Sequence, residues 1–370
     1  MTTRERFLRT LRFEPVDRPP NFELGYWGQT VERWLQEGMP QEAVESGGFY
    51  GHAYFGIERR DFVPLNCGPI PPFEREVMEE TERHILYRDE QGILRKALKV
   101  GTVRGTRPSM DQYLAFPVQT RADFQRLKKR YDSADPRRLP ADWLTRVECD
   151  PDRREAPLCL VPNAALGFYS QARRWMGTEG LSLAFYNDPA LVHEMMDFIA
   201  DFTIALADRV LAEVQVDYFN FFEDLAFKSG PLLSPETFRI FLLPRYQRVT
   251  EFLRARGVTQ IWFDSDGNFE VLIPLLLEAG VTCIWPLEAA AGMDPRSLRR
   301  EYGRDLALSG GLDKREIAKG KKEIEREIMD KVPALVAKGG YIPTLDHSFP
   351  PDISYPNFQY YLEVKRRALA

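Results

Sequence analysis

Acidic and histidine side chains follow short apolar runs throughout the last third of the chain. The apolar stretches 261–263, 281–285, 306–308 and 341–342 each lead into polar residues within a few positions. A short apolar run that ends in a polar loop before an amphipathic stretch is typical of a β-strand followed by a helix. Because the carboxyl ends of parallel strands meet at one edge of a sheet, we expect the side chains there to line one site. These side chains are Asp264, Asp266, Glu288, Asp313, Asp346 and His347.

A further acidic pair, Glu223 and Asp224, follows the aromatic stretch 216–222. This stretch has the composition of a buried strand, so the pair is expected at the same edge. Two interpretations remain open: the carboxylates take part in the chemistry, or they form a salt bridge with Lys228 or with an arginine at the rim. We treat Glu223 as a candidate metal ligand or general acid and Asp224 as a candidate substrate contact.

Asp266 and His347 are the residues of this group for which the sequence most favours a chemical role. An aspartate just before a helix commonly caps it, so we expect one of Asp264 and Asp266 to be a cap. Asp266, next to Gly267, is the better candidate to face the site. His347 follows Asp346, and a neighbouring carboxylate can fix the tautomer of an imidazole.

The rest of the chain supplies the alternating elements that a parallel barrel requires. Residues 21–26 are predicted to form the first strand and residues 28–37 the helix after it, with Trp27 as a candidate substrate contact between them. Ser234 and Pro235 mark the start of a later helix, with the serine as its cap. The fold class that we expect is α/β, a single (β/α)8 TIM barrel over residues 1–370.

Residues 50–140 break this alternation. The proline-rich stretch 62–73 is unsuited to a central strand, whereas residues 82–99 favour two strands joined by a Glu-Gln-Gly turn. Apolar residues are too sparse in this region for a separate core. We therefore expect a lid-like insertion after the first βα unit, packed over the barrel mouth.

Composition narrows the class of protein. The net charge of −5 and the lack of a basic run give no basis for binding nucleic acid. No stretch approaches the roughly 20 apolar residues that a membrane span needs. The four scattered cysteines and the polar N-terminus favour reduced thiols and a cytoplasmic location. The oligomeric state is left open.

The chain resembles the uroporphyrinogen decarboxylase superfamily over nearly its whole length, in collinear order. The resemblance includes Arg-Trp-Met-Gly-Thr-Glu-Gly at 174–180 and Phe-Asp-Ser-Asp-Gly at 263–267. It also includes residues 1–8, 17–20, 109–110, 116–118, 234–236, 286–288, 310–313, 339–342 and 346–347. The resemblance implies a (β/α)8 barrel and one of two chemistries. These are decarboxylation of the acetate arms of a tetrapyrrole, and zinc-dependent methyl transfer involving corrinoids or thiols.

The decarboxylase branch agrees poorly with this sequence. Its members, by the resemblance, bind a substrate with eight carboxylates through paired arginines just after the first strand. Here that stretch is Glu-Leu-Gly-Tyr-Trp-Gly-Gln at 23–29, without arginine. A rim this acidic would also repel a polyanion.

The methyltransferase branch implies a zinc site formed by a His-x-Cys pair and a third ligand after the last strand. In this chain Asp264 and Asp266 stand at the positions of the pair, and His347 stands after the last strand. Three protein ligands with an open position are the arrangement of a catalytic metal. Two hard oxygen donors replace nitrogen and soft sulfur here, so either the metal preference changes or no metal binds.

The function that we expect is metal-assisted methyl transfer or demethylation between a small methylated donor and a corrinoid or thiol. A divalent metal, with zinc preferred, and a corrinoid methyl carrier are the expected cofactors, and a corrinoid protein is a candidate partner. Glu223, Asp266 and His347 are the expected catalytic residues; Asp264, Asp266 and His347 are the metal ligands; Trp27, Asp224 and Glu288 contact substrate. The alternatives are decarboxylation of a porphyrinogen-like or smaller acid, with Asp266 stabilising a cationic intermediate, and non-catalytic binding of a corrinoid or tetrapyrrole.

Overall fold

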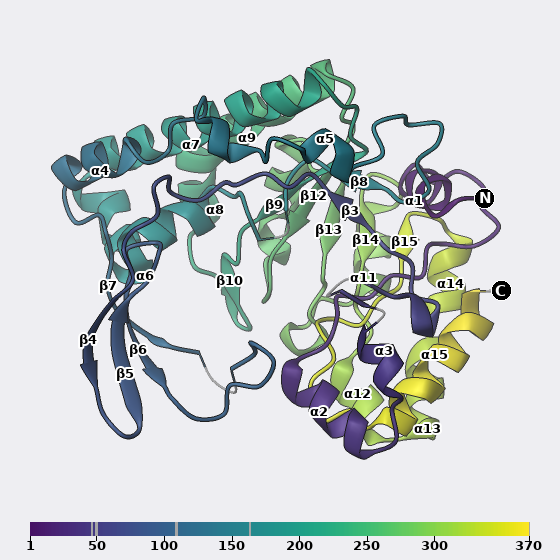
Figure 1. Cartoon of the computed structure of the whole chain (residues 1–370). Helices are drawn as coiled ribbons and strands as arrows, with labels where there is room; N and C mark the ends of the chain where they lie inside the picture. The colour runs from purple at the N-terminus through teal and green to yellow at the C-terminus, as the bar shows by residue number, and fades with distance from the viewer. Residues whose placement is uncertain (46, 49–50, 108–109, 163, 370) are drawn as a thin grey trace.

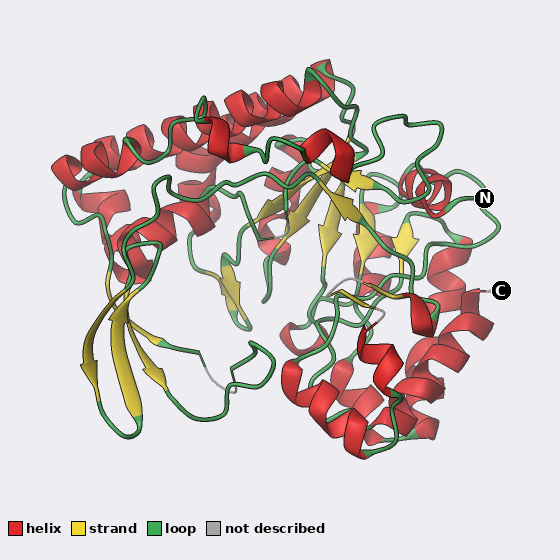
Figure 2. Ribbon diagram, viewed as in Figure 1, coloured by secondary structure: helices red, strands yellow, loops and turns green. Residues whose placement is uncertain are grey.

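Seven parallel strands form the central sheet of this protein. The computed structural model describes residues 1–45, 47–48, 51–107, 110–162 and 164–369. In spatial order the strands are β15 (Tyr341–Ile342), β14 (Ala307–Ser309), β13 (Cys283–Trp285), β12 (Gln260–Asp264), β9 (Tyr218–Phe222), β8 (Leu158–Cys159) and β3 (Asp61–Phe62). Every neighbouring pair is parallel. The sheet curls like that of a TIM barrel, with helices around it (Figures 1 and 2).

Helices connect and cover the strands, as the predicted alternation requires. Figure 1 shows α7 and α9 along one side of the sheet and the helices of the C-terminal part along another. None of the described helices is long and apolar enough to cross a membrane. Their bounds are α1 (Thr3–Leu11), α2 (Gly28–Gln36), α3 (Gln41–Glu45), α4 (Arg121–Lys128), α5 (Trp143–Arg146), α6 (Tyr169–Asn187), α7 (Pro189–Leu211), α8 (Pro235–Thr237), α9 (Leu243–Ala255), α10 (Ile273–Glu278), α11 (Pro295–Tyr302), α12 (Lys314–Lys319), α13 (Lys321–Met329), α14 (Val332–Ala337) and α15 (Tyr355–Leu369).

The interior of the curled sheet is filled mainly by aromatic side chains. Every residue of β12 is buried, as expected of a parallel strand covered on both faces. The indole N–H of Trp285 donates to Asn220 Oδ1 at 2.9 Å. The guanidinium of Arg60 lies 5.8 Å from the ring centre of Trp262 and 5.0 Å from that of Trp285. Such cation–π contacts place a positive charge inside the barrel at modest desolvation cost.

The predicted first strand, residues 21–26, makes a single parallel bridge, between Tyr26 and Phe349. Its other end reaches the opposite edge of the sheet, because Asn21 O accepts the Glu58 N–H at 2.9 Å. The segment therefore links the two edges of the sheet, but with less regular pairing than we expected. Two prolines, Pro19 and Pro20, precede it and remove ladder donors.

The region predicted as an insertion contains a regular sheet. Strands β4 (Glu76–Glu80), β5 (His84–Arg88), β6 (Leu94–Leu98) and β7 (Gln112–Ala115) form an antiparallel sheet that projects from the body in Figure 2. This confirms the predicted hairpin over 82–99. Residues 50, 108 and 109, which include the family-like Ser109, lie outside the described residues. A lid function for this region stays a prediction.

The loop between β6 and β7 contacts the first helix of the barrel. Gln29 Nε2 donates to the carbonyl oxygens of Gly101 and Thr106 at 3.2 and 2.9 Å, and the Gly28 N–H donates to Thr106 Oγ1 at 3.0 Å. A Cβ at Gly28 would collide with the backbone of Val103. The antiparallel sheet is thereby anchored beside the start of α2. The remaining short strands are β1 (Gly47–Gly48) with β2 (Gly51–His52), and β10 (Ala226–Phe227) with β11 (Gly230–Pro231).

Local signals set several helix boundaries. Ser234 caps α8, accepting the Thr237 N–H at 3.0 Å, as the sequence predicts. Helix α6 begins close to the predicted start but runs further, to Asn187, with a kink at Gly177 where φ is 77°. A Cβ there would collide with the ring of Phe116. The chain between α8 and α9 is π-helical over Phe238–Leu242.

A buried carboxylate joins the first and last units of the barrel. Glu23 Oε1 accepts hydrogen bonds from Lys365 Nζ and from the Tyr361 hydroxyl, each at 2.5 Å, and Glu23 Oε2 accepts the Leu345 N–H at 3.0 Å. The side chains of Lys365 and Glu23 are 0% and 1% exposed. Burial lowers the pKa of Lys365, against the effect of Glu23. The ion pair therefore ties α15 and the chain after β15 to the segment 21–26.

Replacing Lys365 with methionine leaves Glu23 buried without its cation. We expect Lys365→Met to lower the free energy of unfolding by about 3–5 kcal/mol in urea denaturation, because an uncompensated buried charge is costly. Tyr361→Phe is the smaller perturbation, expected at about 1.5–3 kcal/mol. The double variant Glu23→Gln, Lys365→Met should recover part of the loss. A loss for Lys365→Met below that of Tyr361→Phe would contradict this account.

Candidate functional site

Asp266 and His347 face each other at the carboxyl edge of the sheet. His347 Nε2 lies 3.7 Å from Asp266 Oδ2, and the two side chains are 34% and 43% exposed. The Ser348 N–H donates to His347 Nδ1 at 2.8 Å, so this ring nitrogen carries a lone pair. The proton of the neutral imidazole then sits on Nε2, directed at Asp266. The structure brings these two predicted residues together, and their catalytic role stays a prediction.

Asp266 lies among like charges. Burial raises its pKa first, the Asp224 and Glu288 carboxylates raise it further, and His347 and Lys314 lower it. The backbone turns sharply after it at Gly267, where φ is 79° and a Cβ would overlap the backbone of Ala226. The Gly267 N–H donates to Glu288 Oε2 at 3.1 Å. The loop thus presents an accessible carboxyl group whose pKa is raised.

Lys314 is a member of the site that the sequence did not suggest. Its Nζ lies 3.6 Å from Glu288 Oε1 and 3.6 Å from Asp346 Oδ1. Asp346 is fully buried and accepts the N–H groups of Ala289 and Lys314 at 3.1 and 3.2 Å. Lys314 comes directly after a loop at a strand end, and this position in the sequence could have identified it as a member of the site. The lysine offsets part of the negative charge of the rim.

Asp264 ends β12 and lies deeper than Asp266. Its pKa is raised well above the usual range, first by burial and then by Asp224 and Asp266, while a hydrogen bond from Asn220 lowers it. The indole N–H of Trp285 donates to the oxygen of the Asn220 amide. Burial and the neighbouring carboxylates thus favour the protonated form of Asp264, whereas the Asn220 contact favours the charged form. It does not cap the following helix, since residues 265–269 intervene before the next helical turn.

Glu223 is placed away from the mouth. Its side chain is fully buried and accepts the Phe168 N–H at 2.6 Å, the Ser170 N–H at 3.0 Å and the hydroxyl of Tyr246. These N–H groups belong to the start of α6, where a carboxylate is favoured. Burial raises the pKa of Glu223 to about 7 despite the three donors. We therefore do not count Glu223 among the residues that could take part in the reaction.

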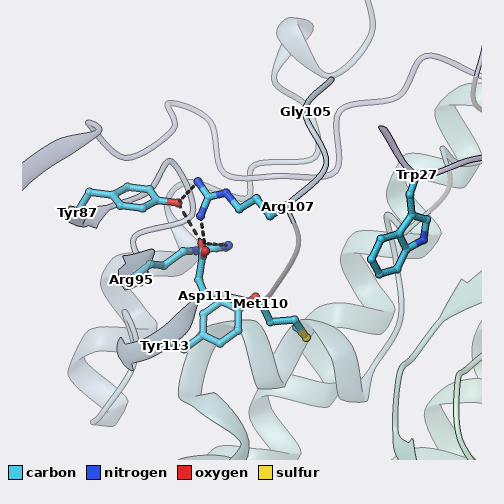
Figure 3. Close-up of a pocket in the computed structure, with 8 residues that line it drawn as sticks. All are labelled: Trp27, Tyr87, Arg95, Gly105, Arg107, Met110, Asp111 and Tyr113. Carbon is cyan, nitrogen blue, oxygen red and sulfur yellow. Dashed lines mark hydrogen bonds and ion pairs between the residues drawn. The ribbon is translucent and has the colours of Figure 1, made fainter. Parts of the chain in front are cut away.

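The other predicted residues divide between the mouth and the framework. Asp224 lies 3.7 Å from Arg173, so its ion pair is with a rim arginine and not with the neighbouring Lys228. Asp313 caps α12, accepting the Arg315 N–H at 2.8 Å, and is not part of the group of side chains around Asp266 and His347. Trp27 lines a cavity of about 510 Å³ between α2 and the antiparallel sheet (Figure 3).

The predicted metal ligands do not fit an ion in this arrangement. Within the described residues, no group of three histidine, cysteine, aspartate or glutamate side chains could hold a metal. His347 Nδ1 is engaged by the Ser348 N–H, and Nε2 carries the proton. Metals bind deprotonated ligands, and burial disfavours the charged form of Asp264. Two of the three predicted donors, those of Asp264 and Asp266, are also oxygens in place of the nitrogen and sulfur that zinc sites commonly use.

The rim carries a negative balance. Lys314, Arg173 and the buried Arg60 face a larger set of carboxylates, namely Asp224, Asp264, Asp266, Glu288 and Asp346. Carboxylates crowded together favour neutral or cationic ligands over polyanions. This mouth is therefore poorly matched to a substrate with many carboxylates.

Comparison with known proteins relates the chain to two kinds of enzyme. The family model for uroporphyrinogen decarboxylase (URO-D) matches residues 98–368. A uroporphyrinogen decarboxylase of Streptomyces coelicolor is 26% identical over 93% of this chain and 89% of its own length. A methylated-thiol–coenzyme M methyltransferase of Methanosarcina mazei is 25% identical over 42% of this chain and 38% of its own.

A solved structure shares the fold. A methyltransferase from Methanosarcina mazei superposes with a TM-score of 0.63 and covers 100% of both chains at 15% identity. At this level of identity the likeness shows the fold alone. It agrees with a TIM-barrel-like architecture.

The raised pKa of Glu223 predicts a pH-dependent contribution to stability. Because its pKa is about 7 when folded, the folded state binds more protons than the unfolded state between about pH 4.3 and pH 7. The free energy of unfolding should therefore fall as pH rises through that interval, by on the order of 2–3 kcal/mol from this group. In Glu223→Gln this component should vanish, as measured by urea denaturation from pH 4.5 to 7.5. Parallel pH profiles for wild type and variant would contradict the assignment.

Proposed function

The chain belongs to the uroporphyrinogen decarboxylase family, and on that basis we propose that it is a methyltransferase or demethylase. The methyl group would leave a small methylated donor for a corrinoid or a thiol. Sequence similarity to a methyltransferase supports this branch. The observation that carries the proposal is the accessible Asp266–His347 pair, in a mouth whose charge disfavours a polyanion.

In this mechanism Asp266 supplies the proton. When the bond between the methyl carbon and the donor heteroatom breaks, the electron pair stays on the heteroatom, which takes the proton from the Asp266 carboxyl group. The methyl group goes to the nucleophilic acceptor. The neutral His347 ring directs its Nε2–H at the carboxylate that forms and stabilises it. Lys314, beside Glu288 and Asp346, limits the repulsion between the charged carboxylates.

Zinc and a corrinoid are the cofactors that the sequence predicts for this branch. Because the donor set does not fit a zinc ion, no step of the mechanism passes through a metal. A corrinoid, delivered by a corrinoid protein, is our proposed methyl acceptor. Its approach would be from the open side of the mouth, where Asp266 and His347 are accessible.

Decarboxylation is the second candidate, because the Streptomyces relative matches nearly the full chain. The same proton of Asp266 would then pass to the carbon that loses carbon dioxide. Removal of this proton donor would impair both reactions, so the product distinguishes them. Formation of a methylated acceptor supports methyl transfer, and release of carbon dioxide from a carboxylated substrate supports decarboxylation.

Loss of the Asp266 proton should abolish turnover without disturbing the fold. We expect Asp266→Asn to lower kcat by about 10²–10⁴-fold, because asparagine keeps the shape but cannot act as an acid. The assay is formation of methylcobalamin from reduced cobalamin and a panel of methylated alcohols, thiols, amines and aryl ethers, followed by absorbance. His347→Gln should lose less, about tenfold, because its partner carboxyl remains.

Asp208→Asn is the matched control. Asp208 pairs with Arg256 on the surface, with its side chain 52% exposed, and this variant should keep full activity. Full turnover by Asp266→Asn would refute the mechanism. Metal analysis of the same preparations adds an independent check, since zinc lost specifically on Asp266→Asn would overturn our reading of the donor set.

A further inference from the structure

The cavity between α2 and the antiparallel sheet has the size of a small-molecule site. Its volume is about 510 Å³, within the usual range for ligand pockets. Figure 3 shows Trp27 on one side and the side chains of β5–β7 and their loop on the other. The lining residues are Trp27, Tyr87, Arg95, Gly105, Arg107, Met110, Asp111 and Tyr113.

The walls of this cavity are aromatic and balanced in charge. Arg95 pairs with Asp89 at 2.5 Å and lies 3.8 Å from Asp111, and Arg107 pairs with Asp111. The two guanidinium groups are thus matched by two carboxylates whose side chains are 8% and 7% exposed. The Arg95 guanidinium also lies 4.9 Å from the ring centre of Tyr113. A charged ligand would find no unpaired opposite charge here.

Two large apolar side chains at this cavity are exposed. Met110 is 83% exposed and Tyr113 is 41% exposed. Trp27 is half-buried on the facing wall. Aromatic rings and a thioether favour a flat aromatic partner, which stacks on rings and contacts sulfur at its edge. An apolar ring in the cavity would cover this exposed surface.

One wall of the cavity is attached to the loop that carries His347. The Trp27 N–H donates to Phe349 O at 3.2 Å, two residues after His347, and the Phe349 N–H donates to Gly25 O at 2.9 Å. The Gly28 N–H donates to Thr106 Oγ1 of the facing loop. Trp27, which lines the cavity, is therefore held next to the chain segment that carries His347.

We propose that this cavity binds the methyl donor, and that the donor is an uncharged aromatic ring bearing a methylated oxygen or sulfur. The inference rests on the proposed methyl transfer. When the bond from methyl carbon to heteroatom breaks, the methyl passes to the reduced corrinoid or thiolate. The electron pair left on the oxygen or sulfur takes the Asp266 proton, so the products are a phenol or thiophenol and the methylated acceptor.

Binding can be tested apart from turnover. By calorimetry on the full chain, methoxybenzene should bind about tenfold more tightly than cyclohexyl methyl ether, which has similar size but no aromatic ring. It should also bind about tenfold more tightly than 4-methoxybenzoate, which carries a charge. Trp27→Ala and Tyr113→Ala should each weaken methoxybenzene binding about tenfold, while Trp27→Phe keeps it within about threefold.

Tyr186→Ala is the control, since Tyr186 is 78% exposed and is not among the residues that line this cavity. Each variant is checked for an unchanged melting temperature, and the two walls are changed separately so that one misfolded variant does not decide the test. Equal binding by wild type, Trp27→Ala and Tyr113→Ala would overturn the site, as would equal binding of the non-aromatic ether. Aromatic-dependent binding without methyl transfer would keep the site and refute the proposed function. Turnover that is unchanged by both substitutions would keep the proposed function and overturn the site.

Discussion

The buried Glu23–Lys365 ion pair is the constraint on which the arrangement of the mouth depends. Glu23 accepts hydrogen bonds from two side chains of α15 and from the Leu345 N–H, so it connects chain segments more than 300 residues apart. Asp346 and His347 follow Leu345 directly, and Trp27 lies four residues after Glu23. One carboxylate therefore helps to set the positions of His347 and of Trp27. Ion pairs of this kind contribute little net stability, so their effect is chiefly to define one arrangement.

Crowded carboxylates give the mouth its chemical character. Taken singly, an aspartate at a strand end would be ionised and solvated. Here Asp264 lies beneath Asp266, and burial together with repulsion from neighbouring carboxylates raises the pKa of both. A carboxyl group whose pKa is raised and which remains accessible can donate a proton to a reaction, and Asp266 meets both conditions. The same crowding explains why the mouth is unsuited to a polyanionic substrate.

Most residues of the mouth could be predicted to lie together from the sequence, because the carboxyl ends of parallel strands lie at one edge of a sheet. This rule requires no knowledge of side-chain packing. It did not reveal which side of a strand each residue faces. Glu223, directly after β9, has the same parity as Phe221, whose ring lies 4.7 Å from that of Tyr246, so both point outward to the helices. Alternation along a strand could have indicated this once one outward residue was known. The roles of Lys314, Glu23 and Lys365 arise from partners distant in sequence, which spacing cannot supply.

The proposed chemistry and the proposed recognition of the donor lie on different parts of this fold. The proposed proton donor is held on rigid strand ends, where neighbouring backbone N–H groups and a sharp turn at Gly267 fix its surroundings. The aromatic surface comes from an antiparallel sheet that the barrel itself does not require. Replacing nitrogen and sulfur donors with carboxylates at the strand ends favours proton transfer over metal binding. A barrel can thus keep its framework while strand-end residues change the reaction and an appended sheet changes the ligand.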